Sequence, residues 1–298
     1  SQLPHSGPHT HEYIGRLVDS APGLTIELGT DLPGVARAIA SLLNEDDESL
    51  RHRASARVGQ ATTSLPLVSV ILPIYNGSRF LPAAVANVLA QGYPSIEIIV
   101  VDDGSTDDVA DLIPALPVDV RYFRQDNAGP AAARNRGVRD SSGAYIAFLD
   151  VDDLWPAGTL PSMVRRLIED PDRAAVHGRA QLFRDDHGRQ EFLGNPAESF
   201  PYYIGAGVYR RSAFEAVGLF DPDLRFGEDT DWFHRAKERN TPILEVDEVT
   251  LLVRRHEGNM TRGKSLLELN TLRLFKRALD RQRQGEGVDD QARAGTTR

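Results

Sequence analysis

The 298-residue sequence contains no cysteine, and it has two methionines and two tryptophans. Without cysteine, the chain can form neither disulfides nor thiolate metal sites, and it has no thiol nucleophile. Since disulfides persist in oxidising compartments, their absence fits a cytoplasmic protein. Any metal ligands are therefore expected among carboxylate, carbonyl and imidazole groups.

Long apolar runs and an excess of positive charge are lacking as well. No stretch approaches the roughly 20 apolar residues of a membrane-spanning helix, and the longest runs, residues 67–74 and 96–101, have the length of strands. Residues 1–11 lack the apolar core of a signal peptide. The formal net charge of −9 argues against a general nucleic-acid binder. A composition of 41% hydrophobic and 26% charged residues is typical of a globular domain.

The sequence pattern divides the chain into three zones. Residues 1–64 have few strand signals and are predicted to form a helical leader and linker, with helices over 33–43 and 45–58. Residues 65–262 carry alternating strand and helix patterns and form the predicted main domain. Residues 263–298 are expected to form a C-terminal helix followed by a polar, disordered tail.

Strands and helices alternate along the main domain with short connections between them. Such alternation implies right-handed crossovers and a mostly parallel α/β sheet, in which ligands bind beyond the carboxyl ends of the strands. The predicted strands are residues 67–74, 96–101, 118–123, 144–149, 174–183, 207–210, 243–246 and 250–254, and the predicted helices are 79–91, 106–116, 130–138, 160–169, 229–239 and 266–281.

Carboxylates follow two of the predicted strands at the expected ligand edge. Asp102 and Asp103 come directly after the second strand, where they can accept hydrogen bonds from a base or a ribose, although Asp and Gly are also ordinary turn residues. Asp150, Asp152 and Asp153 follow the fourth strand. Three carboxylates this close repel one another unless a cation neutralises them. The pattern favours a Mg²⁺ or Mn²⁺ site over a solvated acidic loop.

Three further motifs carry chemically versatile side chains. A helix that begins with small residues and bears Arg134 can hold a phosphate, while its alanine face packs on the sheet. Glu228 and Asp229 begin a helix, which suits the helix dipole and also offers a general base for an acceptor hydroxyl. His256 lies in a glycine-containing loop after a strand and can add an imidazole to a metal site.

Taken in order, these motifs resemble those of family 2 glycosyltransferases, which have the GT-A fold. The resemblance covers roughly residues 66–260. It is carried by residues 68–76, 89–94, 98–107, 127–135, 148–153, 217–221 and 228–229.

The resemblance implies a role for each matching residue. The family's DxD motif corresponds to Asp150 and Asp152, with Asp152 as the principal metal ligand, Asp150 or Asp153 on ribose, water or metal, and His256 completing the metal shell. Pro73 and Tyr75 would form the wall of the nucleotide site next to the uridine. The residues expected to contact the nucleotide sugar are Pro73, Tyr75, Asp102, Asp103, Arg134, Asp150 and Asp152.

The resemblance also implies a mechanism. Members of this type invert the anomeric centre by a single displacement, with Mn²⁺ or Mg²⁺ neutralising the departing diphosphate. Asp229 would remove the proton from the acceptor hydroxyl, and Glu228 would orient Asp229 or touch the acceptor. The donor is expected to be a UDP-sugar, and the acceptor a glycan, a lipid or a small molecule.

Other interpretations of the same residues remain open. One alternative is a catalytically silent nucleotide-sugar-binding scaffold. Another is a nucleotidyltransferase, which the residues 73–77 disfavour because they are not a glycine-rich loop. Trp155 and Trp232 flank the acidic motifs and either contact a sugar ring or pack in the core.

The two ends of the chain add further expectations. Residues 33–44, followed by residues 48–57, resemble the closing helices of a GT-B glycosyltransferase, which would make residues 1–64 the remnant of an upstream domain; otherwise they pack on the main domain or form a homodimer contact. The basic, amphipathic helix 266–281 either packs on the domain or lies peripherally on the inner face of the membrane.

Overall fold

The computed structural model describes residues 65–186, 189–198 and 202–259, together with positions 276, 277 and 281. The described residues all belong to a compact unit that begins at Leu65. The helices predicted over 33–43 and 45–58, and most of the one predicted over 266–281, lie outside the described residues. No helix among the described residues is both long and apolar enough to cross a membrane.

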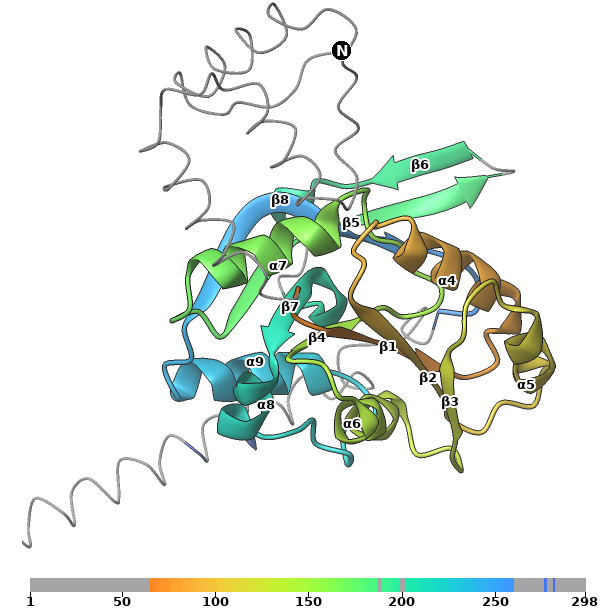
Figure 1. Cartoon of the computed structure of the whole chain (residues 1–298), viewed down its shortest axis with the longest axis horizontal. Helices are drawn as coiled ribbons and strands as arrows, with labels where there is room; N and C mark the ends of the chain where they lie inside the picture. Colours follow the sequence, from red (N-terminus) through yellow and green to blue (C-terminus); the bar gives the residue numbers. More distant parts are fainter. Residues whose placement is uncertain (1–64, 187–188, 199–201, 260–275, 278–280, 282–298) are drawn as a thin grey trace, which may run out of the picture. The chain divides into compact units, whose positions relative to one another are not determined.

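A mixed sheet forms the centre of the described unit (Figure 1). Its strands run in the order β3-β2-β1-β4-β7-β5-β6, and β8 pairs with β5. The first four strands along the chain are parallel to one another, whereas β7 is antiparallel to both β4 and β5. The strands are β1 (Val68–Ile74), β2 (Ile96–Asp102), β3 (Arg121–Arg124), β4 (Tyr145–Phe148), β5 (Ala175–Asp186), β6 (Arg189–Leu193), β7 (Gly207–Arg210) and β8 (Ile243–Arg254).

Helices cover both faces of this sheet (Figure 1). Because side chains alternate along a strand, Val70 and Leu72 of β1 pack in one apolar cluster with residues of α4 and α7, while Ile71 packs in the other with residues of α6, α8 and α9. The helices are α4 (Leu81–Leu89), α5 (Val109–Leu112), α6 (Pro130–Asp140), α7 (Thr159–Glu169), α8 (Arg211–Val217) and α9 (Glu228–Glu238), with 3₁₀ turns η1 (Ser78–Phe80), η2 (Ile113–Ala115), η3 (Pro196–Glu198) and η4 (Ile204–Ala206).

Several predicted elements differ from the structure. The helix predicted over 106–116 was wrong in extent, because Pro114 lacks an amide donor and α5 gives way to η2 there. The strand predicted over 118–123 lies instead at Arg121–Arg124. The strands predicted over 243–246 and 250–254 are one strand, β8, whose pairing with β5 shifts register midway.

One strand and one α-helix were not predicted at all, and neither were the 3₁₀ turns η3 and η4. Four of the five residues of β6 are exposed, so the strand lacks the alternation that marks a half-buried strand. The helix α8 spans seven residues, too few to show a helical period.

Close packing of α6 on β1 places Arg134 at the sheet edge. A Cβ atom on Gly137 would lie 2.3 Å from Ile71 Cγ2, so only glycine allows this approach. The neighbouring Asn135 is buried and bonds Phe220 twice, donating to its carbonyl at 2.8 Å and accepting from its amide at 2.9 Å. The helix therefore positions both Arg134 and the segment that leads into α9.

Candidate functional site

The loops after β1, β2 and β4 meet at one edge of the sheet. Ile74, the last residue of β1, pairs with Asp102, and Ile71 pairs with Phe148 at the end of β4. Asn76 adopts a left-handed backbone conformation, with φ of 54°, and its Oδ1 accepts a hydrogen bond from Thr106 N at 2.7 Å. The loops after β1 and β2 are thereby tied together.

Asp102 is fully buried, and its carboxylate bonds to groups of the protein. Its carboxylate accepts hydrogen bonds from Tyr122 Oη at 2.6 Å, Ser105 N at 2.7 Å and Arg124 Nη1 at 3.1 Å. Burial alone would raise the pKa of Asp102, but these hydrogen bonds and the charge of Arg124 hold it below the ordinary value. Asp102 therefore fixes the turn after β2 and links it to β3.

Asp103 also holds a loop in place. Its Oδ1 accepts from Gln125 Nε2 at 2.8 Å and Ala128 N at 3.0 Å, and its Oδ2 accepts from Gly129 N at 2.8 Å. These bonds secure the chain that leads into α6. Of the other predicted nucleotide contacts, Tyr75 is 52% exposed and Pro73 is partly buried.

Arg134 brings together two acidic groups that are distant in sequence. Its Nη2 donates to both carboxylate oxygens of Asp150, at 2.7 and 3.0 Å, and its Nη1 forms an ion pair with Glu228. Burial would lower the pKa of Arg134, but the charges of Asp150 and Glu228 raise it. Its Nε is buried and has no hydrogen-bond partner among the described residues. The predicted nucleotide ligand is thus a bridge between the loop after β4 and the start of α9.

The pKa of Asp229 is raised well above that of an ordinary aspartate. It follows Glu228 in the first turn of α9 and is partly buried. Burial and the adjacent charge of Glu228 raise its pKa from 3.8 to about 7, against the opposing effect of Arg134. Burial likewise raises the pKa of Glu228, which Arg134 counteracts. A carboxylate with a pKa near neutrality can accept a proton and release it again at physiological pH.

A small cavity lies beside Asp229. Its volume is about 20 Å³, enough for one water molecule or one hydroxyl oxygen. Its lining includes acidic, basic and apolar residues. The lining residues are Arg134, Asp150, Asp153, Tyr203, Ile204, Gly205, Asp229 and Leu251.

Two of the three predicted metal ligands lie in contact. His256 Nε2 is 3.0 Å from Asp152 Oδ2, and this oxygen-plus-imidazole pair is of the type that suits Mn²⁺. Asp153 is buried, and its Oδ1 accepts a hydrogen bond from Arg254 N at 2.9 Å, so it fits a metal shell less well. Among the described residues, no group of three or more His, Cys, Asp or Glu side chains is arranged to hold a metal ion.

Arg254, at the end of β8, was missed by the sequence reasoning. Its amide binds Asp153, its Nε donates to the carbonyl of Asp152 at 2.9 Å, and its Nη1 pairs with Asp185 at 2.7 Å. The acidic loop after β4 is therefore held by the end of β8, the strand that precedes His256. The sequence places Arg254 at the end of a predicted strand, where it could have been singled out, but nothing in the sequence indicates its partners.

Both tryptophans pack in the core. Trp155 is 3% exposed and Trp232 is fully buried, so neither presents a ring to a sugar in this structure. Their indole N–H groups donate to backbone carbonyls, Trp155 to Gly205 and Trp232 to Gly218, each at 2.9 Å. Of the two interpretations of these residues, core packing is the correct one.

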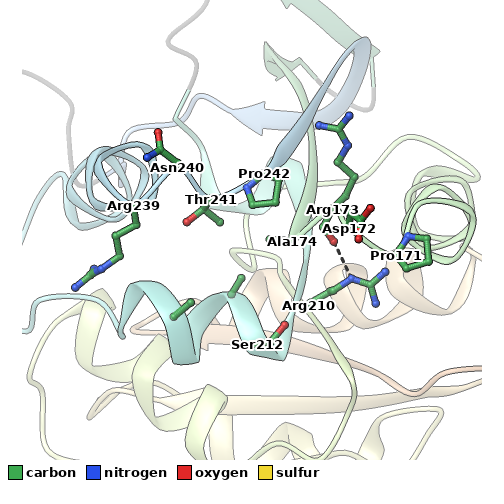
Figure 2. Close-up of a pocket in the computed structure, with 12 residues that line it drawn as sticks. Pro171, Asp172, Arg173, Ala174, Arg210, Ser212, Arg239, Asn240, Thr241 and Pro242 are labelled. Atoms are coloured by element: carbon green, nitrogen blue, oxygen red, sulfur yellow. Dashed lines mark hydrogen bonds between the residues drawn. The ribbon is translucent and has the colours of Figure 1, made fainter.

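A larger hollow, of about 360 Å³, lies elsewhere, where β7 ends and β5 and β8 begin (Figure 2). The guanidinium groups of its arginines bond to other groups of the chain. Arg210 donates to the carbonyls of Arg173 and Leu167, Arg173 pairs with Asp170, and Arg239 donates to Val217 O. Figure 2 shows the guanidinium groups of Arg173 and Arg239 pointing away from each other. None of the predicted site residues lines this hollow.

Residues 69–218, about half of the chain, match glycosyl transferase family 2. The chain therefore belongs to this family, as the order of its motifs predicted. An uncharacterized glycosyltransferase of Rickettsia bellii is 48% identical over 184 residues, which cover 58% of this chain and 26% of that protein. The putative teichuronic acid biosynthesis glycosyltransferase TuaG of Bacillus subtilis is 35% identical over 141 residues, covering 46% of this chain and 56% of the relative.

Solved structures show the same fold. S. aureus TarS 1-349 in complex with UDP-GlcNAc has a TM-score of 0.54 and 22% identity, and the match covers 66% of this chain and 61% of that one. The predicted GT-A architecture is thereby confirmed. Across eight of its curated relatives, the chain spans from 15% to 63% of their length.

Proposed function

We propose that the protein is an inverting glycosyltransferase that moves a sugar from a UDP-sugar to a hydroxyl group of an acceptor. One observation carries the proposal: Asp229, with a pKa raised to about 7, lines a cavity that admits a single oxygen atom. This pairing supplies a base and a place for its nucleophile. Membership of the family and the fold of TarS support the choice of a nucleotide-sugar donor.

In the proposed mechanism, the acceptor hydroxyl oxygen occupies the cavity beside Asp229. As this oxygen forms a bond to the anomeric carbon, Asp229 takes its proton, and the bond from that carbon to the diphosphate breaks. Glu228 keeps the pKa of Asp229 high, and Arg134 holds Glu228 and Asp150 in place. The sugar passes in one displacement, so its anomeric configuration inverts.

Asp152 and His256 would hold the metal ion, Mn²⁺ in preference to Mg²⁺ because of the imidazole. When bound, such an ion neutralises the charge that develops on the departing diphosphate. Asp150 has a side chain that is 43% exposed, which leaves it able to contact the ribose or the metal-bound phosphates. Tyr75 is exposed enough to flank the base, while Asp102 and Asp103 shape the surrounding loops.

The donor and the biological setting are proposed from the relatives. The complex of TarS with UDP-GlcNAc makes UDP-GlcNAc the first donor to test, and the name of TuaG points to glycan biosynthesis. We place the protein in the cytoplasm, with its domain at residues 65–262 and residues 1–64 as a leader or a homodimer contact. Arg277 pairs with Asp221 and Arg281 with Asp231, which supports contact of these two arginines with the domain over binding to a membrane.

Replacing Asp152 by alanine should abolish metal-dependent binding of UDP, because it removes the central metal ligand. Calorimetric titration with UDP, first with Mn²⁺ and then with EDTA, measures the effect. Asp111→Ala, which removes an exposed aspartate of α5, is the control and should bind as the wild type does. Unchanged UDP affinity of Asp152→Ala in Mn²⁺ would reject the metal assignment. Tight binding of UDP without any transfer to acceptors or water would favour the silent scaffold.

A further inference from the structure

Four consecutive backbone carbonyls beside the cavity each accept a hydrogen bond from a different side chain. The segment 203–206 contains η4 and precedes β7. The four bonds are His177 Nε2 with Tyr203 O at 2.9 Å, Tyr209 Oη to Ile204 O at 3.0 Å, Trp155 Nε1 to Gly205 O at 2.9 Å, and Thr250 Oγ1 to Ala206 O at 2.8 Å.

The four donors are buried and come from separate parts of the fold. His177 lies on β5, Tyr209 on β7 and Thr250 on β8, whereas Trp155 follows β4. Their exposed fractions range from 0% for Tyr209 to 6% for His177. Buried carbonyls need partners, and this turn has each of its four carbonyls bonded to a buried side chain, three of them from distant parts of the chain, so it cannot shift without breaking several bonds.

The same segment forms one wall of the cavity. Its first three residues, Tyr203, Ile204 and Gly205, line the cavity together with Asp229 and Arg134. A Cβ atom on Gly205 would lie 3.3 Å from Phe148 O and 3.4 Å from Leu251 Cδ1, and Leu251 is another lining residue. The φ angle of Gly205 lies outside the left-handed region, so an alanine there is restricted by space alone.

We propose that residues 203–206 form a rigid wall that fixes the nucleophilic oxygen against Asp229, and that His177, Trp155, Tyr209 and Thr250 are its positioning residues. Gly205 is the position that keeps the cavity open to one oxygen atom. The inference rests on the proposed function, since the oxygen it positions is that of the acceptor hydroxyl. With no acceptor present, water takes this place: its oxygen bonds to the anomeric carbon, its proton passes to Asp229, and UDP leaves.

The test measures five variants, beginning with two substitutions of tyrosine by phenylalanine. Tyr209→Phe removes the buried bond to Ile204 O, and Tyr93→Phe removes a part-buried bond to the carbonyl of Pro66, just before the start of β1 and away from the cavity. Thr250→Val removes the bond to Ala206 O while keeping the side-chain shape, and Thr250→Ser restores the hydroxyl. Gly205→Ala narrows the cavity. The rate of UDP release from UDP-GlcNAc and the Kd for UDP are measured for each variant, below its melting temperature.

Tyr209→Phe, Thr250→Val and Gly205→Ala should each lower the rate of UDP release about 10-fold or more, because a small misplacement of the nucleophile is costly. The Kd for UDP should stay within about twofold, since the wall does not touch the nucleotide in the proposed arrangement. Thr250→Ser should recover the rate, and Tyr93→Phe should leave it unchanged. Equal losses in Tyr93→Phe and Tyr209→Phe, or a Kd that rises in step with the lost rate, would overturn the proposal.

A second measurement tests the rigid wall independently of the proposed glycosyltransferase function. If the wild type released no UDP from UDP-GlcNAc and bound no UDP, the proposed function would fail, but the wall would still be judged by amide hydrogen exchange. Residues 203–206 should exchange faster in Tyr209→Phe and Thr250→Val than in the wild type, and at the wild-type rate in Tyr93→Phe. Unchanged exchange in the first two variants would refute a wall held by these bonds.

Discussion

Replacing Asp229 by asparagine should lower turnover by about 100-fold or more and leave the Kd for UDP nearly unchanged, because loss of a general base typically costs that much. Asparagine keeps the shape of the side chain and its hydrogen bond with Thr230 N, at 2.8 Å in the wild type, but it cannot take a proton. Steady-state rates of UDP release, with calorimetric titration of UDP, measure the two effects separately.

The control for this prediction is Asp223→Asn. Asp223 is exposed in the segment before α9, and its loss should not alter the rate. If Asp229→Asn retained full turnover, Asp229 would not be the base. A parallel loss of UDP affinity and rate would instead indicate that Asp229 helps to bind the donor.

The pH dependence offers an independent check on Asp229. Because the base must be unprotonated, the rate should rise as the pH increases through about 7, and Asp229→Asn should lack this limb. Stability should change in the opposite direction. The pKa in the folded state lies above the ordinary 3.8, so the free energy of unfolding falls as pH rises from 3.8 through about 7. Urea unfolding at pH 5 and pH 8 should show this fall in the wild type and a smaller fall in Asp229→Asn.

Replacing Arg134 by methionine should reduce the free energy of unfolding by about 3–5 kcal/mol, because it leaves a buried carboxylate, Glu228, without its cation. Urea denaturation measures the loss. The double variant Arg134→Met/Glu228→Gln should recover much of it, since the buried charge is then removed together with its partner.

Arg136→Met is the matched control on the same helix. Arg136 pairs with Asp140 one turn away, and both side chains are more than a third exposed, so its loss should cost less than about 1 kcal/mol. An effect of Arg134→Met no larger than that of Arg136→Met would mean that the bridge between Asp150 and Glu228 contributes little to stability.

The elements that the sequence predicted well are those whose pattern is local. The apolar runs of β1, β2 and β4 are buried on both sides by helices, so their sequences alone identify them. α6 begins at Pro130 as expected. By contrast, β6 is largely exposed, and its pairing with β5 depends on contacts that no local period reveals.

In the candidate site, too, the residues that follow a local pattern were predictable and those that depend on distant contacts were not. The acidic loops after β2 and β4 were predictable, because the carboxyl ends of parallel strands meet at one edge. The partners of Arg134 were not, since Glu228 is 94 residues away and reaches it only through the packing of α9. Nothing in the sequence of residues 203–206 marks them as a wall. The hydrogen bonds that hold them come from four side chains on other elements.

The reversed direction of β7 has a consequence for how such proteins can diverge. A parallel strand brings its end to the ligand edge, whereas β7, which is antiparallel to β4, brings its beginning there. The groups proposed for the donor therefore lie mostly in one uninterrupted stretch, residues 73–152, and the wall and base proposed for the acceptor lie in a later one, residues 203–229. Insertions or exchanges between β5 and β7 can thus alter which acceptor fits while the nucleotide-facing loops keep their sequence.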